Sequence, residues 1–428
     1  MNEEDRTRLE EFRQFRKEVR GSAEYLLVGI DVAKDKHYAF FGTATGKTLL
    51  RRLVFENNLE GFRKLLAQAE AMKVQNGLKR VVFGMEPTAN YHKPLGEHLI
   101  RCGKQVVLVS GVAAHENRKT VDGRWDTNDT RDAANVADLV SQGKCLFYEF
   151  PVGAIQDLRN LLSLKRRFKR VEHGYRVRIR NHLVAKYFPE LDRYYDQSPS
   201  TSLAIVRWCL APSEIAGLEY KQFVQRVGSG QRRLAQERRL QAIWKMAVDS
   251  VGCEAGPVVE FEGQVMVEGL KQIQEAIADI EEKIQEVCLQ FPEYEFLLSI
   301  PGFGPDVSSK VLGAIGDPFR FQNGRQVLKL AGLDLSAERS GKSSESAIPV
   351  ISRKGKADLR YALYQAAFIA STKNQGFMAY YTDKLRGRER EPGIKTKMRV
   401  KLAAKLLIMA WTLMKKKEPF DPDYLAIE

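Results

Sequence analysis

Four carboxylates stand where one predicted element gives way to the next. Asp31 ends the apolar run YLLVGID, and Glu86 ends a second such run, RVVFGME. Asp129 and Asp132 are three residues apart at the start of a helical pattern, so they share one helix face. Carboxylates at the ends of adjacent buried strands converge in space, and Mg²⁺ or Mn²⁺ prefers hard oxygen ligands of this kind. The pattern predicts a divalent-metal site suited to phosphoryl transfer.

Each carboxylate also has a purely structural interpretation. An aspartate after a strand is often a turn residue, and Asp129 could cap the helix that follows it. Asp126 leaves the ligand set open, because Asp126, Asp129 and Asp132 are spaced at intervals of three residues. We favour Asp129 and Asp132, since the apolar pattern of residues 133–140 runs on directly from them.

A second candidate, Ser340, lies in the C-terminal third of the chain. It precedes Gly341 in a polar, serine-rich loop, and loops of this composition are usually solvated linkers. No histidine lies nearby to act as a base. A nucleophilic serine here would need another activator, for which the metal cluster is the available candidate.

Glycine turns and basic residues flank this loop. Gly302 and Gly304 belong to a Pro-Gly-x-Gly turn between two helical patterns. In a helix-hairpin-helix such turn amides bind a DNA phosphate; the alternative is an ordinary turn between packed helices. The basic residues that suit phosphate contacts are Lys342, Arg353, Lys354, Lys356 and Arg360.

Apolar patterning predicts the elements that must position the carboxylates. Strands are expected at 25–31, 37–42, 48–55, 80–86 and 105–110, with helices over 59–72, after Pro94 and from about 129. The first three strands form an antiparallel meander, and helices and strands then alternate. This is the order of ribonuclease H-like domains, so the chain is expected to open with an α/β domain.

The rest of the chain reads as helical, so the fold class is α/β followed by α. Residues 150–292 contain almost no strand signal, and residues 293–415 form a mostly helical zone. Leu270, Ile273, Ile277, Ile280, Ile284 and Val287 are spaced 3, 4, 3, 4, 3, which is a heptad seam. That seam could pair with a helix of its own chain or with a second chain.

We expect five segments in chain order. They are a charged, solvent-facing N-terminal arm (1–24), the α/β domain (25–147), a helical and coiled-coil region (148–292), a C-terminal helical domain (293–415) and an irregular tail (416–428).

Composition points to a polyanionic partner. The 428 residues carry a net charge of +14, and nucleic acid is the commonest partner of so basic a protein, although a surface that is merely basic is the alternative. Five scattered cysteines without a Cys-x-x-Cys pair indicate neither a zinc site nor disulfides, which fits a reducing cytoplasm. The N-terminus is too charged for a signal peptide, and the apolar stretch 402–414, broken by Lys405, is too short for a membrane span.

One motif is misleading. Residues 42–48, GTATGKT, resemble a phosphate-binding loop but are one residue short between the glycines, and a strand follows them. A phosphate cradle needs a helix N-terminus, so we interpret this segment as a hairpin turn.

Six motifs in order make the chain resemble the DEDD transposases of bacterial insertion sequences, also called bridge-RNA-guided recombinases. The N-terminal motifs are GIDVAKDKH (29–37), EPTANY (86–91) and NDTRDAANVADL (128–139). The C-terminal motifs are SIPGFG (299–304), AGLDLSAERSG (331–341) and SRKGKADLRYALY (352–364). The resemblance covers about residues 25–415.

The resemblance implies roles for particular residues. Asp31, Glu86, Asp129 and Asp132 would hold Mg²⁺ or Mn²⁺, and Ser340 would attack a DNA phosphate to form a covalent phosphoserine link. The domains would be RuvC-like, coiled-coil and transposase domains. Departures from the family pattern, such as Leu335 where the family often has proline, leave the subgroup open.

The resemblance also implies partners. A structured non-coding guide RNA would pair with target and donor DNA. The active site would be assembled between protomers, so the protein would be a homo-oligomer, a dimer or a tetramer. It would act in the bacterial cytoplasm, associated with the nucleoid, without a membrane partner.

Three other functions remain as alternatives. A RuvC-like nuclease or junction resolvase would explain the carboxylates but would leave the C-terminal third without a role. A non-catalytic nucleic-acid-binding protein would not need four intact carboxylates. An actin-like sugar kinase shares the first-strand aspartate but needs glycine-rich phosphate loops, which the sequence lacks.

Overall fold

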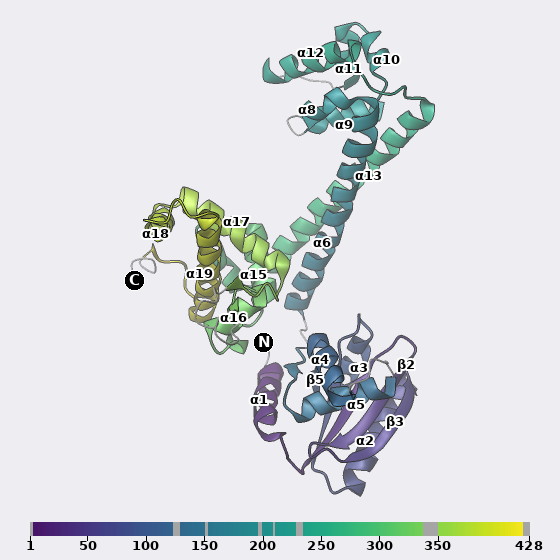
Figure 1. Cartoon of the computed structure of the whole chain (residues 1–428), viewed down its shortest axis with the longest axis vertical. Coiled ribbons are helices and arrows are strands. Elements are labelled where there is room, and N and C mark those ends of the chain that lie inside the picture. The colour runs from purple at the N-terminus through teal and green to yellow at the C-terminus, as the bar shows by residue number, and fades with distance from the viewer. Residues whose placement is uncertain are drawn as a thin grey trace. The chain divides into compact units, whose positions relative to one another are not determined.

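A computed structural model describes residues 3–122, 129–149, 153–195, 199–208, 210–227, 234–336 and 350–422. The chain divides into two compact units, Met1–Val152 and Gly153–Glu428, which are described separately (Figure 1). The elements of the first unit are α1 (Glu3–Glu18), β1 (Tyr25–Asp31), β2 (Lys36–Thr43), β3 (Thr48–Glu56), α2 (Leu59–Gln75), β4 (Arg80–Met85), α3 (His92–Arg101), β5 (Gln105–Leu108), α4 (Gly111–Asp122), α5 (Asp129–Ser141) and β6 (Leu146–Phe147).

The first unit is built on a six-stranded sheet with the order β3-β2-β1-β4-β5-β6. β1, β2 and β3 are antiparallel neighbours, whereas β4 runs parallel to β1 and β5 parallel to β4. The predicted meander and the alternation after it are therefore confirmed, and the sheet is compatible with a ribonuclease H-like fold. The structure adds α4 and β6, which the apolar patterning did not predict.

The misleading glycine motif is a hairpin turn, as predicted. Thr43 N–H donates to the Lys47 carbonyl at 2.9 Å between β2 and β3. Gly46 adopts a φ of +89°, a conformation that glycine reaches without the Cβ clash of other residues.

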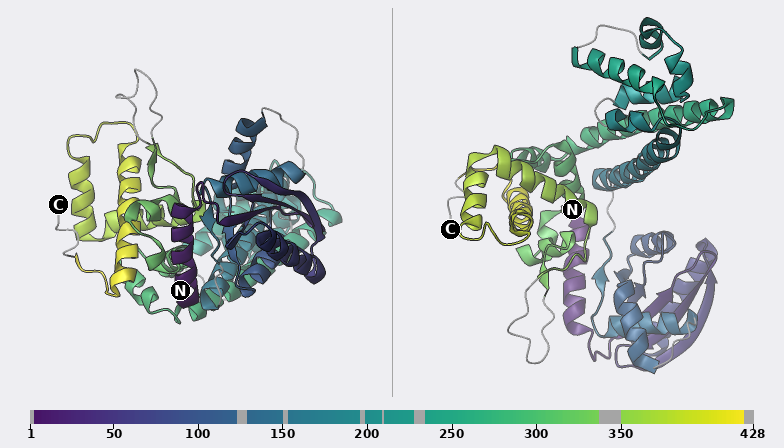
Figure 2. Two further views of the ribbon diagram at one scale, coloured as in Figure 1. Left: turned by 90° about the horizontal axis from the view of Figure 1, so that it is seen from below. Right: turned by 45° about the horizontal axis from the view of Figure 1, so that its top comes forward.

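Strand alternation sorts the first unit into two apolar layers. Leu26, Val28 and Ile30 of β1 face the core that α2 and α3 cover, whereas Tyr25 and Leu27 face the core that α1, α4 and α5 cover. Figure 2 shows helices on both sides of the twisted sheet. Gly29 and Asp31, two and four residues after Leu27, consequently lie on the α4 and α5 face.

The N-terminal segment is a helix, but the expectation that it faces solvent is wrong for one of its faces. Leu9, Phe12, Phe15 and Val19 are buried against the sheet, and the Phe15 ring meets Tyr25 edge to face at 5.4 Å. The apolar residues recur every three or four positions, so one stripe is buried while the charges occupy the remaining surface.

The second unit is helical apart from one short strand pair in its described residues. Its elements are α6 (Ala154–Arg178), η1 (Ile179–Val184), α7 (Ala185–Tyr187), η2 (Pro189–Leu191), α8 (Asp192–Tyr195), α9 (Pro199–Trp208), α10 (Pro212–Ala216), α11 (Tyr220–Val227), α12 (Leu234–Val248), α13 (Pro257–Cys288), α14 (Pro292–Leu298), α15 (Pro305–Ile315), η3 (Pro318–Arg320), α16 (Gly324–Ala331), β7 (Leu335–Ser336), β8 (Val350–Ile351), α17 (Ala357–Lys373), α18 (Gln375–Leu385) and α19 (Ile394–Lys416).

The heptad seam of α13 pairs within its own chain. Lys165 of α6 contacts Glu281 at 2.9 Å, and Glu172 accepts a hydrogen bond from Gln274 at 3.3 Å. Partner numbers fall along α13 as they rise along α6, so the two helices run antiparallel, side by side in Figure 1. Ile277, Ile280 and Ile284 of the seam are buried. Of the two alternatives, a helix of the same chain or a second chain, the first therefore holds for this part of the seam.

Two apolar cores flank this helix pair. One gathers residues of η1 and α9–α12 with Leu270 of α13, and the other gathers residues of α14–α19 with Ile280, Ile284 and Cys288 of α13. In the described part of the chain, no helix combines the length and apolarity that crossing a membrane requires.

Candidate functional site

Two of the predicted carboxylates leave the sheet side by side. β1 and β4 are parallel neighbours in a register that pairs Gly29 with Gly84 and Ile30 with Met85. Asp31 and Glu86 are the next residues along, and both are half-buried. Since each follows a paired glycine by two residues, the two side chains point to the same face of the sheet, the one that α4 and α5 cover.

The paired glycines let α5 lie directly on that face. A Cβ at Gly29 would lie 2.1 Å from the Ala133 carbonyl oxygen, and one at Gly84 would lie 2.6 Å from a methyl group of Val140. Only a residue without a side chain permits so close an approach of the helix backbone. Because Asp132 precedes Ala133, the first turn of α5 lies over the end of β1, where Asp31 emerges.

α4 brings further polar groups to the same edge. A Cβ at Gly111, the first residue of α4, would lie 2.9 Å from Oε1 of Glu86, so the Glu86 carboxylate lies against this helix N-terminus, where negative charge is favoured. Asn117 of α4 donates to Asn135 and to Asp138 of α5, each at 2.8 Å. These bonds fix α4 against α5.

Arg118 is the residue at this edge that sequence reasoning missed. Its Nε lies 2.9 Å from Oδ1 of Asp132, and the two side chains are 28% and 18% exposed. The ion pair therefore puts a cation against a predicted metal ligand. The sequence offered no signal for it, because α4 was not predicted.

The donor set matches a divalent cation in its chemistry. Carboxylate oxygens from β1, from the end of β4 and from α5 share one edge of the sheet, and such ligands suit Mg²⁺ or Mn²⁺. Within the described side chains, no group of three or more His, Cys, Asp or Glu is arranged to hold an ion. The side chain of Asp129 lies outside the described part, as does all of Asp126, and Asp132 contacts Arg118.

The predicted nucleophile lies beyond the described residues, but the base of its loop does not. Ser340 and Lys342 fall within residues 337–349, which are outside the described ranges. β7 and β8 pair on either side, with Leu335 opposite Ile351. Ser352 N–H donates to the Asp334 carbonyl at 2.8 Å. The two ends of the serine loop are therefore held together.

The glycine turn lies between two helices, as predicted, but its two glycines differ. Gly302, at φ +91°, packs on α17, where a Cβ would lie 2.4 Å from the Ala366 carbonyl oxygen. Gly304 caps the start of α15, and a Cβ placed on it would have no described neighbour within 4 Å.

Two residues after Gly304, Asp306 places a carboxylate in the first turn of α15. This carboxylate accepts hydrogen bonds from Lys165 at 2.7 Å and from Lys310 at 2.6 Å. Burial raises the pKa of Asp306, but the two ammonium groups outweigh burial and lower it. The geometry of Gly302 and of Asp306 thus favours the packing alternative for this turn.

The predicted phosphate-binding residues after the serine loop have distinct settings. Arg353, Lys354 and Lys356 are exposed, and Arg353 adopts a positive φ of +54°. Arg360 instead donates to the Ala331 carbonyl at 2.9 Å, where α16 ends. Arg360 therefore stabilises the turn at the end of α16. Arg353, Lys354 and Lys356 are exposed, so a ligand can reach them.

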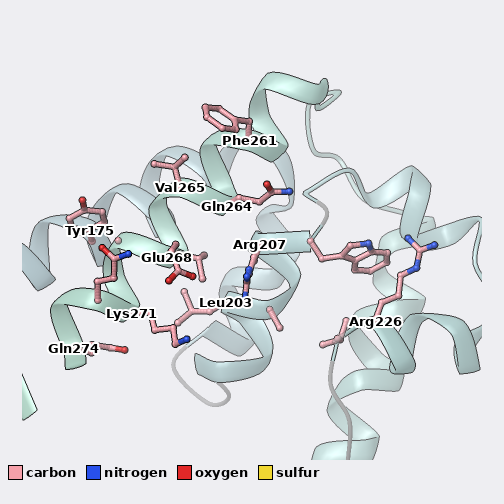
Figure 3. A pocket seen from close by; sticks show the side chains of 16 residues that line it. Tyr175, Leu203, Arg207, Arg226, Phe261, Gln264, Val265, Glu268, Lys271 and Gln274 are labelled. Carbon is pink, nitrogen blue, oxygen red and sulfur yellow. The ribbon is translucent and has the colours of Figure 1, made fainter. Parts of the chain in front are cut away.

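A wide cavity of about 1460 Å³ lies elsewhere in the second unit, among α6, α9, α11 and α13. Tyr175, Arg207, Arg226, Phe261 and Lys271 are among its lining residues (Figure 3). Its described lining includes none of the predicted site residues. It is therefore not part of the constellations that the sequence predicts.

Comparison with known proteins identifies the family. Residues 28–189 match a family model described as a DEDD transposase, and residues 294–382 match the transposase IS116/IS110/IS902 family. The chain is 22% identical over 399 residues to an insertion element IS116 uncharacterized 44.8 kDa protein of Streptomyces clavuligerus, covering 92% of this chain and 96% of that protein.

A second relative is a pilin gene-inverting protein of Moraxella bovis, which is 25% identical over 158 residues, or 36% of this chain and 48% of that protein. The DEDD family implies the use of a divalent metal. The two family matches cover the carboxylate edge and the serine loop separately. The chain therefore belongs to the DEDD transposases of insertion sequences and is a DNA transposase.

Proposed function

We propose that this transposase cuts and rejoins DNA through a covalent phosphoserine intermediate formed on Ser340, with Mg²⁺ or Mn²⁺ held by Asp31, Glu86, Asp129 and Asp132. A structured non-coding RNA guides it to target and donor DNA, and a dimer or tetramer assembles the active site. The observation that supports the proposal most is the meeting of Asp31, Glu86 and the first turn of α5 at one sheet edge.

The domains divide this work. Residues 25–147 form the RuvC-like domain that carries the carboxylates, and residues 148–292 form a helical, coiled-coil region. Residues 293–415 form the transposase domain, in which Ser340 lies, and residues 416–428 are a tail. The N-terminal segment 1–24 packs against the sheet and stabilises it, since its apolar stripe is buried there.

The chemistry is a transesterification at phosphorus. The Ser340 oxygen forms a bond to a DNA phosphorus while the bond between that phosphorus and one deoxyribose oxygen breaks. The serine proton passes to a carboxylate, and the departing deoxyribose oxygen takes up a proton. A bound divalent cation would supply charge stabilisation for the phosphoryl group. In the second step the serine oxygen is the leaving group: a new deoxyribose oxygen attacks the phosphorus and displaces the serine.

The carboxylate part is tested by Asp31→Asn and Asp132→Asn. Each variant should lose strand cleavage by about 100-fold or more, because loss of a catalytic metal removes several kcal/mol of transition-state stabilisation. Folding and DNA binding should be nearly intact. Asp35→Asn, which changes an exposed aspartate between β1 and β2, is the matched control and should cleave normally. Robust Mg²⁺-dependent cleavage by either active-site variant would overturn the metal-site assignment.

The serine part is tested by trapping the reaction with DNA and locating the nucleotide-bearing peptide by mass spectrometry. We expect the adduct on Ser340, no adduct in Ser340→Ala, and normal adduct formation in Ser343→Ala and Ser344→Ala. An adduct on another residue, or full recombination by Ser340→Ala, would contradict the assignment. A nuclease that uses water would instead leave protein-free DNA ends.

A further inference from the structure

A basic groove of about 460 Å³ lies in the second unit between α6, α15 and the first turn of α17. Six of its described lining residues are basic: Arg159, Lys165, Arg166, Lys169, Lys310 and Lys356. Asp358 is the one carboxylate among the described residues that line it. The groove joins the basic stretch of α6 to Lys356, which lies almost two hundred residues further along the chain.

Two of the cations form a fixed part of the groove wall. Lys165 is only 13% exposed and contacts Glu281 at 2.9 Å and Asp306 at 2.7 Å. Burial lowers the pKa of Lys165, but its hydrogen bonds to Asp306 and Glu281 outweigh burial and raise it. Lys310 contacts Asp306 as well, at 2.6 Å. Glu281 and Asp306 do not line the groove, but they offset the charge of Lys165 and Lys310, so these two lysines hold the wall together and do not serve as ligand contacts.

Two other cations are available to a ligand. Arg166 and Lys169 are one turn apart on α6, and each side chain is 50% exposed. Arg166 pairs with Asp358 at 3.0 Å, and Lys169 pairs with Glu172 at 3.1 Å. The Arg166–Asp358 pair is exposed on both sides and contributes little to stability, so a phosphate can replace Asp358 at small cost. Glu172 is only 10% exposed, but it also contacts Arg176 at 2.9 Å, so it keeps a cationic partner when Lys169 turns to a phosphate.

An aromatic ring completes the groove. Tyr361 lines it from α17, and this side chain is 65% exposed. An exposed aromatic ring beside a row of cations is the arrangement by which proteins stack an unpaired base and hold the adjoining phosphates. A duplex keeps its bases stacked inside, so it would make no use of the ring.

We propose that this groove binds an unpaired segment of nucleic acid, with phosphates on Arg166, Lys169 and Lys356 and one base stacked on Tyr361. The inference rests on the proposed function in that a recombinase guided by RNA must handle unpaired strands. RNA and DNA share this chemistry, and the experiment separates them.

The test measures fluorescence anisotropy of the full chain with labelled oligouridine, oligodeoxythymidine and a duplex DNA of equal length, all in EDTA. Tyr361→Leu should weaken binding of one or both single strands about 5-fold or more, and should change duplex binding by less than about 2-fold. Tyr361→Phe retains the ring and should bind like the natural protein. Lys169→Gln should lower the salt slope for single strands by about 0.7.

The matched control is Lys373→Gln, which changes an exposed cation in the last turn of the same helix, away from the groove. Lys373→Gln should leave the difference in affinity between single strands and duplex unchanged. Tyr361→Leu should have the same effect in this background as in the natural protein. Single-strand binding unaffected by Tyr361→Leu would overturn the inference, as would an equal loss on the duplex. Because EDTA removes divalent metal, binding is measured separately from cleavage: a chain that binds as expected but fails to recombine contradicts the proposed function alone.

Discussion

At the scale of single residues, Arg118 forms an ion pair with Asp132, one of the carboxylates that we propose as metal ligands. The guanidinium lies 2.9 Å from the carboxylate, and α4, which carries it, is tied to α5 by Asn117. An arginine and a divalent cation are both positive, so they compete for the same carboxylate oxygen. In the proposed function, in which Asp132 is a metal ligand, this ion pair must loosen when metal binds.

We therefore expect Arg118→Ala to bind Mn²⁺ more tightly, by about 5-fold, which corresponds to roughly 1 kcal/mol for a partly exposed ion pair. Isothermal titration calorimetry measures the affinity directly. Arg118→Lys keeps the charge and should stay near the natural protein, and Asp132→Asn should lose affinity in either background. Weaker binding by Arg118→Ala would mean that Arg118 orients Asp132 instead of competing for it.

His37 makes the first unit sensitive to acid. The imidazole is fully buried, its Nδ1 accepts a hydrogen bond from Ala33 N–H at 3.2 Å, and its ring meets Phe55 edge to face. Burial lowers the pKa of His37 below its ordinary value of 6.5. Below pH 6.5 the unfolded chain takes up this proton more readily than the folded chain, so stability falls as the pH falls toward the folded pKa.

Thermal unfolding at several pH values measures this dependence. Between about pH 7 and pH 5 the Tm of the natural protein should fall more steeply than that of His37→Asn, which keeps an acceptor but does not titrate. Parallel profiles for the two proteins would exclude His37 as a source of the acid sensitivity. His92, whose pKa burial also lowers, would remain in both proteins as a common background.

At the scale of elements, the contact of α5 with the sheet positions the site. Gly29 and Gly84 are neighbours in adjacent strands, and a Cβ on either would come within 3 Å of an atom of α5. The distance from the Ala133 carbonyl, 2.1 Å, leaves no room for even a methyl group at Gly29. Any side chain there must displace the first turn of α5 from Asp31.

Gly29→Ala should therefore destabilise the first unit by about 1–3 kcal/mol and weaken Mn²⁺ binding. Denaturant unfolding and calorimetry measure the two effects. Gly174→Ala is the matched control, because Gly174 lies inside α6 with nothing within 4 Å of its Cβ position. That change should stabilise the protein by up to about 1 kcal/mol, since alanine favours helix. Unaltered stability in Gly29→Ala would refute the role of this contact.

The antiparallel pair α6 and α13 has a corresponding role in the second unit. Tyr175 of α6 packs so closely on α13 that a Cβ at Gly269 would lie 2.6 Å from its ring. Further along, Lys165 reaches across to Glu281. The pair therefore fixes the part of the basic groove that α6 forms relative to α13, which carries Glu281.

At the scale of the whole molecule, charge governs association with nucleic acid. The net charge of +14 favours binding of a polyanion, and each phosphate contact releases condensed counterions. We expect log K to fall linearly with log salt concentration, by about 0.9 for each duplex contact and about 0.7 for each single-strand contact. Titrations of DNA and RNA at low and moderate salt measure the slope, and a value near zero would contradict this expectation.

Local patterning was enough to locate the strands β1 to β5 and the carboxylates that follow the apolar runs of β1 and β4. β1 and β4 are continuous apolar runs that end at charged residues, and the apolar periodicity of α5 begins at Asp129. Such patterns can be read without a structure, because a strand or helix imposes its period on neighbouring residues. The motif order also identified the family. The role of Ser340 rests on the same resemblance, since that residue is outside the described part of the chain.

Which surfaces meet became clear only from the packing. α4 was not predicted from the sequence, so the contact of Arg118 with Asp132 could not be predicted either. The stripe on α1 could have faced solvent or a partner, and the seam of α13 could have paired with another chain. Periodicity specifies a face but not its partner, because the partner is chosen by shape and buried area between residues far apart in sequence. The basic groove likewise could not be predicted, because its cations come from α6, α15 and the start of α17, which only the packing brings together.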